Sequence, residues 1–171
     1  MNMRNVNIVA RYESKLLRRD IVFLGFVVIA LVGISLWQMI KQGRVNVFWY
    51  KVALPSSFPF FSMYYYNLVQ VLIALFVCME VVYRERKKDA MEVFLCRPFR
   101  NSEYCIGRFL GIFRMFLFVN ICVLLVCMYI NLWVVGAPFN VWIYVFYLFT
   151  LSIPTLIFVL GCALSISAMV K

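Results

Sequence analysis

The sequence contains no histidine, and only 7 of its 171 residues are aspartate or glutamate. Proton-transfer catalysis and metal binding draw mostly on histidine and carboxylate side chains, so both are hard to assemble from this composition. The sequence also lacks a G-x-x-x-x-G-K-[ST] motif, so this chain does not bind ATP through a P-loop. We therefore expect no enzyme activity, no metal and no cofactor in this chain.

The sequence is also poor in charge, with 14% charged and 65% hydrophobic residues. A soluble domain is about half apolar and a quarter charged, and several apolar runs here reach the roughly 20 residues that span hydrocarbon. In lipid the backbone must satisfy its own hydrogen bonds, so the spans are expected to be helices. The six cysteines form no C-x-x-C pair and lie mostly in apolar runs, which favours buried, reduced thiols over a disulfide frame.

The apolar runs predict an all-α membrane protein with four transmembrane helices, over residues 21–40, 62–83, 112–135 and 141–170. The loop 41–61 is rich in aromatic residues and proline, as expected at an external membrane interface. The short connection after residue 135 predicts that the third and fourth spans are antiparallel. The fourth span exceeds one bilayer thickness, and Pro154 is its expected kink.

The net charge of +10 comes from basic residues that cluster at the ends of the spans. Residues 1–20 contain five lysines and arginines and the region 84–114 contains eight, against three in the loop 41–61 and none in the next connection. The positive-inside rule predicts that both termini and the central segment are cytoplasmic. This distribution suits anionic lipid better than nucleic acid, for which no recognition motif is present.

Residues 1–20 predict an amphipathic helix in the membrane interface. Its basic residues share one side, and apolar residues occupy the other: Arg4, Arg11, Lys15 and Arg18 against Val9, Tyr12 and Leu16. This pattern is typical of helices that contact anionic lipid. Glu13 falls in the apolar sector, where it either pairs with a nearby basic residue, reaches water, or contacts a soluble partner.

Two charged residues lie inside predicted spans. A carboxylate within a membrane is costly unless it is paired or hydrated, so Glu80 is expected to form an intramembrane ion pair. Arg84 on the same helix and Arg114 on the third span are the candidate partners. A role of Glu80 in proton coupling remains open, although one acidic residue makes no relay.

The central segment 84–111 is the longest polar stretch in the chain. Its first half has the pattern of an amphipathic helix, with Glu85, Lys88 and Glu92 on one side and Met91, Phe94 and Leu95 on the other. Arg97-Pro98 then interrupts this helix, because proline lacks the backbone donor. Ser102 is placed to cap a second helix that has Glu103 in its first turn and leads through Gly107, Arg108 and Gly111 into the third span.

This order of motifs resembles the permease subunits of ABC-2 type transporters. The matching stretches are Arg84-Glu85-Arg86, Ala90 to Leu95, Arg97-Pro98, Ser102-Glu103-Tyr104 and Gly107-Arg108, while Asp89-Ala90 stands where the family has Gly-Thr. The helix at 1–20 is similar to the family's elbow helix. The resemblance implies a coupling helix that docks on a cytoplasmic ABC ATPase subunit, which binds the ATP. The implied contact residues are Glu92, Phe94, Leu95, Arg97 and Pro98.

The resemblance further implies a homo- or heterodimer of permease subunits that exports a substrate. Family members commonly have six spans, whereas four are predicted here, so the chain is either part of a larger permease or a shorter subunit that assembles with others. The alternative function is a membrane scaffold or accessory subunit, which recruits the same kind of cytoplasmic partner but contains no transport pathway. A third interpretation of the central helix is that it lies on lipid and binds no partner.

Overall fold

The computed structural model describes residues 3–44, 57–86, 101–135 and 139–169. Within these ranges all regular secondary structure is helical and no strand occurs, which confirms the all-α prediction. The elements in chain order are α1 (Met3–Leu17), α2 (Ile21–Arg44), α4 (Ser57–Arg86), α6 (Asn101–Ile130), the π-helical turn η1 (Asn131–Val135), α7 (Val141–Tyr147), the π-helical turn η2 (Leu148–Ser152) and α8 (Ile153–Met169).

Three stretches of the described chain are long and apolar enough to cross a membrane: Pro59–Glu80, Ser102–Trp133 and Val141–Ile166. They correspond to the predicted second, third and fourth spans, as a multi-pass membrane protein requires. The stretch Ile21–Gly33 is apolar but shorter, and it forms the first part of the 24-residue helix α2. The first predicted span, over residues 21–40, therefore remains a prediction.

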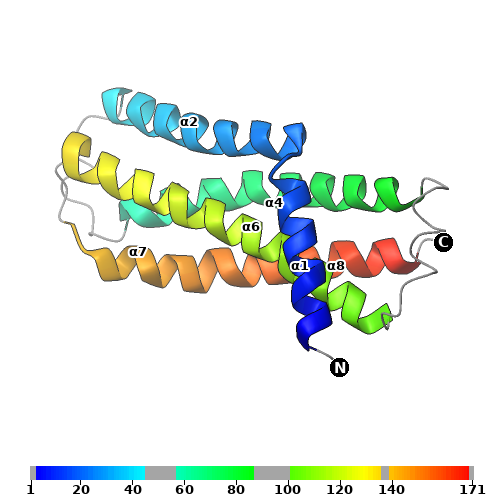
Figure 1. Ribbon diagram of the computed structural model, residues 1–171. Helices are drawn as coiled ribbons and strands as arrows, with labels where there is room; N and C mark the ends of the chain where they lie inside the picture. The colour runs from blue at the N-terminus through cyan, green and yellow to red at the C-terminus, as the bar shows by residue number, and fades with distance from the viewer. Residues whose placement is uncertain (1–2, 45–56, 87–100, 136–138, 170–171) are drawn as a thin grey trace.

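The long helices form an antiparallel bundle (Figure 1). Helices α2 and α6 run in one direction, and α4 and the α7–η2–α8 rod run in the other. Both α2 and α8 pack against α4 and against α6, so α4 and α6 face one another across the bundle with few direct contacts. The antiparallel arrangement predicted for the third and fourth spans is therefore present, since α6 and the α7–α8 rod pack together.

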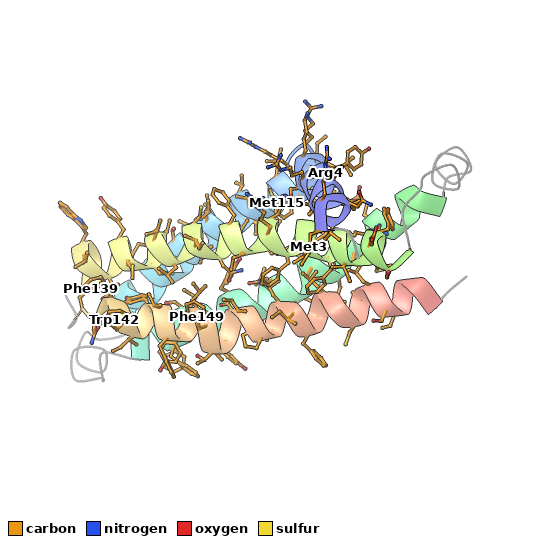
Figure 2. The ribbon with its side chains drawn as sticks, turned by 60° about the horizontal axis from the view of Figure 1, so that its bottom comes forward. Met3, Arg4, Met115, Phe139, Trp142 and Phe149 are labelled. Carbon is orange, nitrogen blue, oxygen red and sulfur yellow. The ribbon has the colours of Figure 1, made fainter. Side chains whose placement is uncertain are left out.

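Helix α1 lies across the bundle and packs mainly on α6 (Figure 1). Figure 2 shows Met3 and Arg4 of α1 away from the end of the bundle at which Phe139 and Trp142 lie. The predicted helix at 1–20 is therefore present, although it ends at Leu17.

A tight turn joins α1 to α2. Asp20 begins α2 as its N-cap residue, because its carboxylate accepts a hydrogen bond from the backbone N–H of Val22 at 2.9 Å. The next turns of α2 bury Phe23 and Phe26 against Phe116 of α6, with ring centroids 5.5 and 5.6 Å apart. Helices α1 and α2 thus both pack against the first half of α6.

Candidate functional site

The residues predicted to contact a partner ATPase, Glu92, Phe94, Leu95, Arg97 and Pro98, lie outside the described residues. The structure resumes at Asn101, where α6 begins. Glu103 lies in the first turn of α6, as predicted, and Ser102 is already inside that turn, so it does not precede the helix as a cap. The candidate site that can be described is therefore the base of α6 and the helix that crosses it.

Helix α1 crosses α6 at two glycines that lie one helical turn apart. A Cβ atom built on Gly107 would lie 2.8 Å from both the Val6 carbonyl oxygen and the Val9 Cβ atom. A Cβ atom on Gly111 would lie 2.8 Å from the Ala10 carbonyl oxygen. These distances leave no room for a side chain, so the two backbones meet as they do at a G-x-x-x-G motif. The four-residue spacing of Gly107 and Gly111 could have indicated a close helix contact, but no such contact was predicted from the sequence.

Polar contacts fix the register of the crossing. The Ser14 hydroxyl lies 2.8 Å from the Ala10 carbonyl oxygen of its own helix and 3.1 Å from the Gly111 carbonyl oxygen of α6. Nearer the start of both helices, the Asn5 amide donates a hydrogen bond to the Glu103 carboxylate at 3.2 Å. Asn5 thus contacts α6 near the start of both helices, and Ser14 contacts α6 further along, at Gly111.

The apolar side of α1 has two environments. Val6, Val9 and Leu17 are buried in the protein, whereas Tyr12 on the neighbouring stripe is 56% exposed. The basic residues that were predicted to share one face are exposed, and they lie away from the buried side: Arg4, Arg11, Lys15 and Arg18. Glu13 is buried with its Cβ atom against Gly111, so its place in the apolar sector reflects packing on α6.

The structure places the candidate ion-pair residues Glu80 and Arg114 on α4 and α6, with Glu80 half-buried and Arg114 exposed. Their pairing stays a prediction. A different basic residue, Arg108, is buried at 6% exposure, with its guanidinium 5.9 Å from the centre of the Tyr104 ring. Arg108 also lies within electrostatic range of Cys78 on α4. Arg108 is therefore a buried basic side chain on the side of α6 that faces α4.

Two hydrogen bonds between side chains connect the helices inside the bundle. The Asn67 amide of α4 donates to the Ser152 hydroxyl of η2 at 3.2 Å, and also to the Met63 carbonyl oxygen at 2.8 Å. The Asn131 amide of η1 donates to the Tyr144 hydroxyl of α7 at 2.7 Å. The sequence analysis did not predict either pair, although it placed the fourth span beside the third.

The predicted kink at Pro154 coincides with a change of helix type. The π-helical turn η2 ends at Ser152, two residues before the proline, and π-helical turns and prolines are common causes of bends in helices. The hydroxyls of Thr150 and Thr155 donate to the carbonyl oxygens of Phe146 and Leu151 in the same helix, at 2.8 and 2.6 Å. These bonds give both hydroxyls an acceptor within their own helix, as expected for polar side chains in lipid.

No group of three or more cysteine, aspartate or glutamate side chains suitable for a metal ion occurs among the described residues. No protein-family model, no curated protein and no solved structure matches the chain. The function must therefore be argued from the residues and their arrangement.

Proposed function

We propose that this chain is the membrane-spanning permease subunit of an ATP-driven exporter that resembles the ABC-2 type. In this proposal a separate cytoplasmic ATPase subunit binds and hydrolyses ATP, and it presses on the helix within segment 84–111. The chain itself performs no covalent chemistry. Its long helices rock between inward-open and outward-open states, in the inner membrane of a bacterium with both termini in the cytoplasm.

The observation that carries the proposal is the close crossing of α1 over the base of α6. Helix α6 begins at Asn101, directly after the part of the central segment that would contact the ATPase. Any displacement of that segment is therefore applied to the first turns of α6. Because Gly107 and Gly111 bring the two backbones into contact, α1 must move together with α6.

The same displacement passes on to α2. Only two residues, Arg18 and Arg19, separate the end of α1 from Asp20, which caps α2. Phe23 of α2 is buried against Phe116 of α6. A force applied at the start of α6 thus reaches two of the long helices, as an exporter requires.

The π-helical turn η2, which ends two residues before Pro154, gives the proposed motion a place in the α7–α8 rod where the helix is already irregular. A π-helical turn can shift a residue in or out of the helical ladder at lower cost than a regular turn, and such turns are frequent at functional sites. Asn67 of α4 holds this turn through Ser152. The π-helical turn therefore lies where the rod is joined to a neighbouring helix.

Co-purification of ATPase activity with the tagged chain tests the proposal. The chain is extracted from bacterial membranes in mild detergent, and ATP hydrolysis by the eluate is measured. Phe94→Asp with Leu95→Asp places two charges on the apolar stripe of the predicted helix, so we expect the activity to be lost. The matched control, Phe94→Leu with Leu95→Met, keeps the stripe apolar and should retain the activity. Equal activity in the wild type and the aspartate variant would contradict the proposal.

A further inference from the structure

Several buried side chains in the described residues have hydrogen-bonding atoms that make no hydrogen bond within those residues, and three of them are the uncharged side chains of Tyr66, Gln70 and Asn120. Tyr66 and Gln70 of α4 are each 1% exposed, and Asn120 of α6 is fully buried. The Tyr66 hydroxyl, both polar atoms of the Gln70 amide and the Asn120 Oδ1 atom have no hydrogen-bond partner in the part of the chain that the structure describes. The Asn120 amide nitrogen, by contrast, donates to the Phe116 carbonyl oxygen at 2.8 Å.

The antiparallel register brings Gln70 and Asn120 to one level, with Tyr66 one helical turn further outward. Tyr66 of α4 lies within electrostatic range of Cys122 and Cys127 of α6. Along the axis of the bundle, Tyr66 therefore lies at a height between these two cysteines. Gln70 lies one helical turn further inward on the same face of α4. One turn inward on α6, which runs in the opposite direction, leads to Asn120. Gln70 and Asn120 therefore lie at the same depth.

The arrangement of the helices places this level on the bundle axis. Helices α4 and α6 face each other across the bundle, and α2 and α8 close its two sides. The buried faces of α4 and α6 therefore point toward the centre. At roughly 1.5 Å per residue, Gln70 lies about 20 Å along α4 from Ser57. Gln70 and Asn120 thus lie near the middle of the predicted spans, away from either end of the bundle.

Unused hydrogen-bonding atoms at this depth are costly. Burying an amide without a partner is unfavourable, and lipid offers no replacement donor or acceptor. Apolar residues at these positions would avoid the cost. In folded proteins, buried polar groups of this kind usually bind internal water, which makes about three hydrogen bonds per molecule.

We propose that the bundle centre is a water-binding site formed by Gln70 and Asn120, with Tyr66 at its outer edge. The side chains are uncharged and supply both donors and acceptors: the Gln70 amide nitrogen, the Tyr66 hydroxyl, and the carbonyl oxygens of Gln70 and Asn120. Water both donates and accepts, so it matches this set better than an ion of either sign. The inference does not rest on the proposed transport function, because it concerns the folded bundle alone.

Water-edited solid-state NMR of the isotopically labelled chain in lipid bilayers tests the site. Magnetisation is transferred from water to the protein, and its build-up is compared between the Gln70 side-chain amide and the Ala74 methyl group. Ala74 is the matched control, because it is fully buried one turn further along the same face of α4. We expect severalfold faster build-up at Gln70. Equal and slow build-up at both would mean that the two amides pair directly in a dry core, and it would overturn the proposal.

A variant gives an independent test. Replacing both amides, with Gln70→Leu and Asn120→Leu, keeps the side-chain size and removes the polar atoms on both helices. Water transfer to the Tyr66 ring should then fall to the level of Ala74. Undiminished transfer to Tyr66 would show that the two amides do not hold the water, which would contradict the proposed site.

Discussion

Gly107 of α6 lies directly against Val9 of α1, so closely that a Cβ atom on the glycine would be 2.8 Å from the valine Cβ. The atoms that would collide belong to the backbone or to Cβ positions, which cannot swing aside as a long side chain would. The crossing therefore depends on the absence of a side chain at Gly107, and in the same way at Gly111. This contact fixes the position of α1 against α6.

Alanine at Gly107 should separate the two helices. We expect Gly107→Ala to destabilise the protein by about 1–3 kcal/mol, the usual range for overpacking. The measurement is the thermal unfolding midpoint in detergent. Gly25→Ala and Gly161→Ala are the controls, because nothing lies within 4 Å of a Cβ atom at either position. These controls should be neutral or slightly stabilising, and an equal loss in all three variants would argue against a close crossing.

Removing the Ser14 hydroxyl should weaken the same crossing by a smaller amount. Ser14→Ala deletes the contact with the Gly111 carbonyl oxygen, and a buried hydrogen bond contributes about 0.5–1.5 kcal/mol. Ser165→Ala serves as the control, because that exposed hydroxyl bonds only the Gly161 carbonyl oxygen of its own helix. Equal unfolding midpoints for the two variants would mean that the Ser14 contact adds nothing.

The hydrogen bond between Asn67 and Ser152 should appear as a coupling between helices α4 and η2. A double-mutant cycle with Asn67→Leu and Ser152→Ala should give about 0.6 kcal/mol, the average for such bonds in membrane proteins. A second cycle, with Thr150→Val in place of the serine change, should give no coupling, since Thr150 is exposed and bonds within its own helix. Coupling of the same size in both cycles would contradict the assignment.

The cap at Asp20 should be needed for the start of α2. Asp20→Ala removes the acceptor for the Val22 N–H and should cost about 1 kcal/mol, whereas Asp20→Asn keeps a side-chain oxygen there and should cost little. Both variants are compared by thermal unfolding in detergent. Equal losses in the two variants would show that the charge of Asp20, and not its capping bond, is what stabilises the turn.

Much of the fold follows from the sequence because helices in lipid are dictated by long apolar runs. Spans two to four, the antiparallel arrangement of spans three and four and the irregular helix just before Pro154 were all visible as composition, spacing or a single proline. The helix at the N-terminus was visible as a charge pattern, and its end differed by three residues because Asp20 caps the next helix. Local signals of this kind need no knowledge of the partner helix.

The contacts between helices could not be predicted in the same way. Val6 and Val9 read as lipid-facing, because an apolar stripe looks the same whether lipid or another helix covers it. The spacing of Gly107 and Gly111 indicates a close approach but does not say which helix approaches. The burial of Arg108 could not be predicted either, since burial depends on how α6 is rotated in the bundle.

The side of the membrane on which α6 begins is the central claim, because an ATPase can reach segment 84–111 only from the cytoplasm. Cys105 is exposed in the second turn of α6 and reports on this side. A variant that keeps Cys105 and replaces the other five cysteines by alanine is treated with a membrane-impermeant maleimide, in intact spheroplasts and in inverted vesicles. Asn140→Cys in a cysteine-free chain is the control for the external side, since Asn140 is exposed at the opposite end of the bundle. The account predicts that Cys105 is labelled only in inverted vesicles; labelling of Cys105 in intact spheroplasts would contradict it.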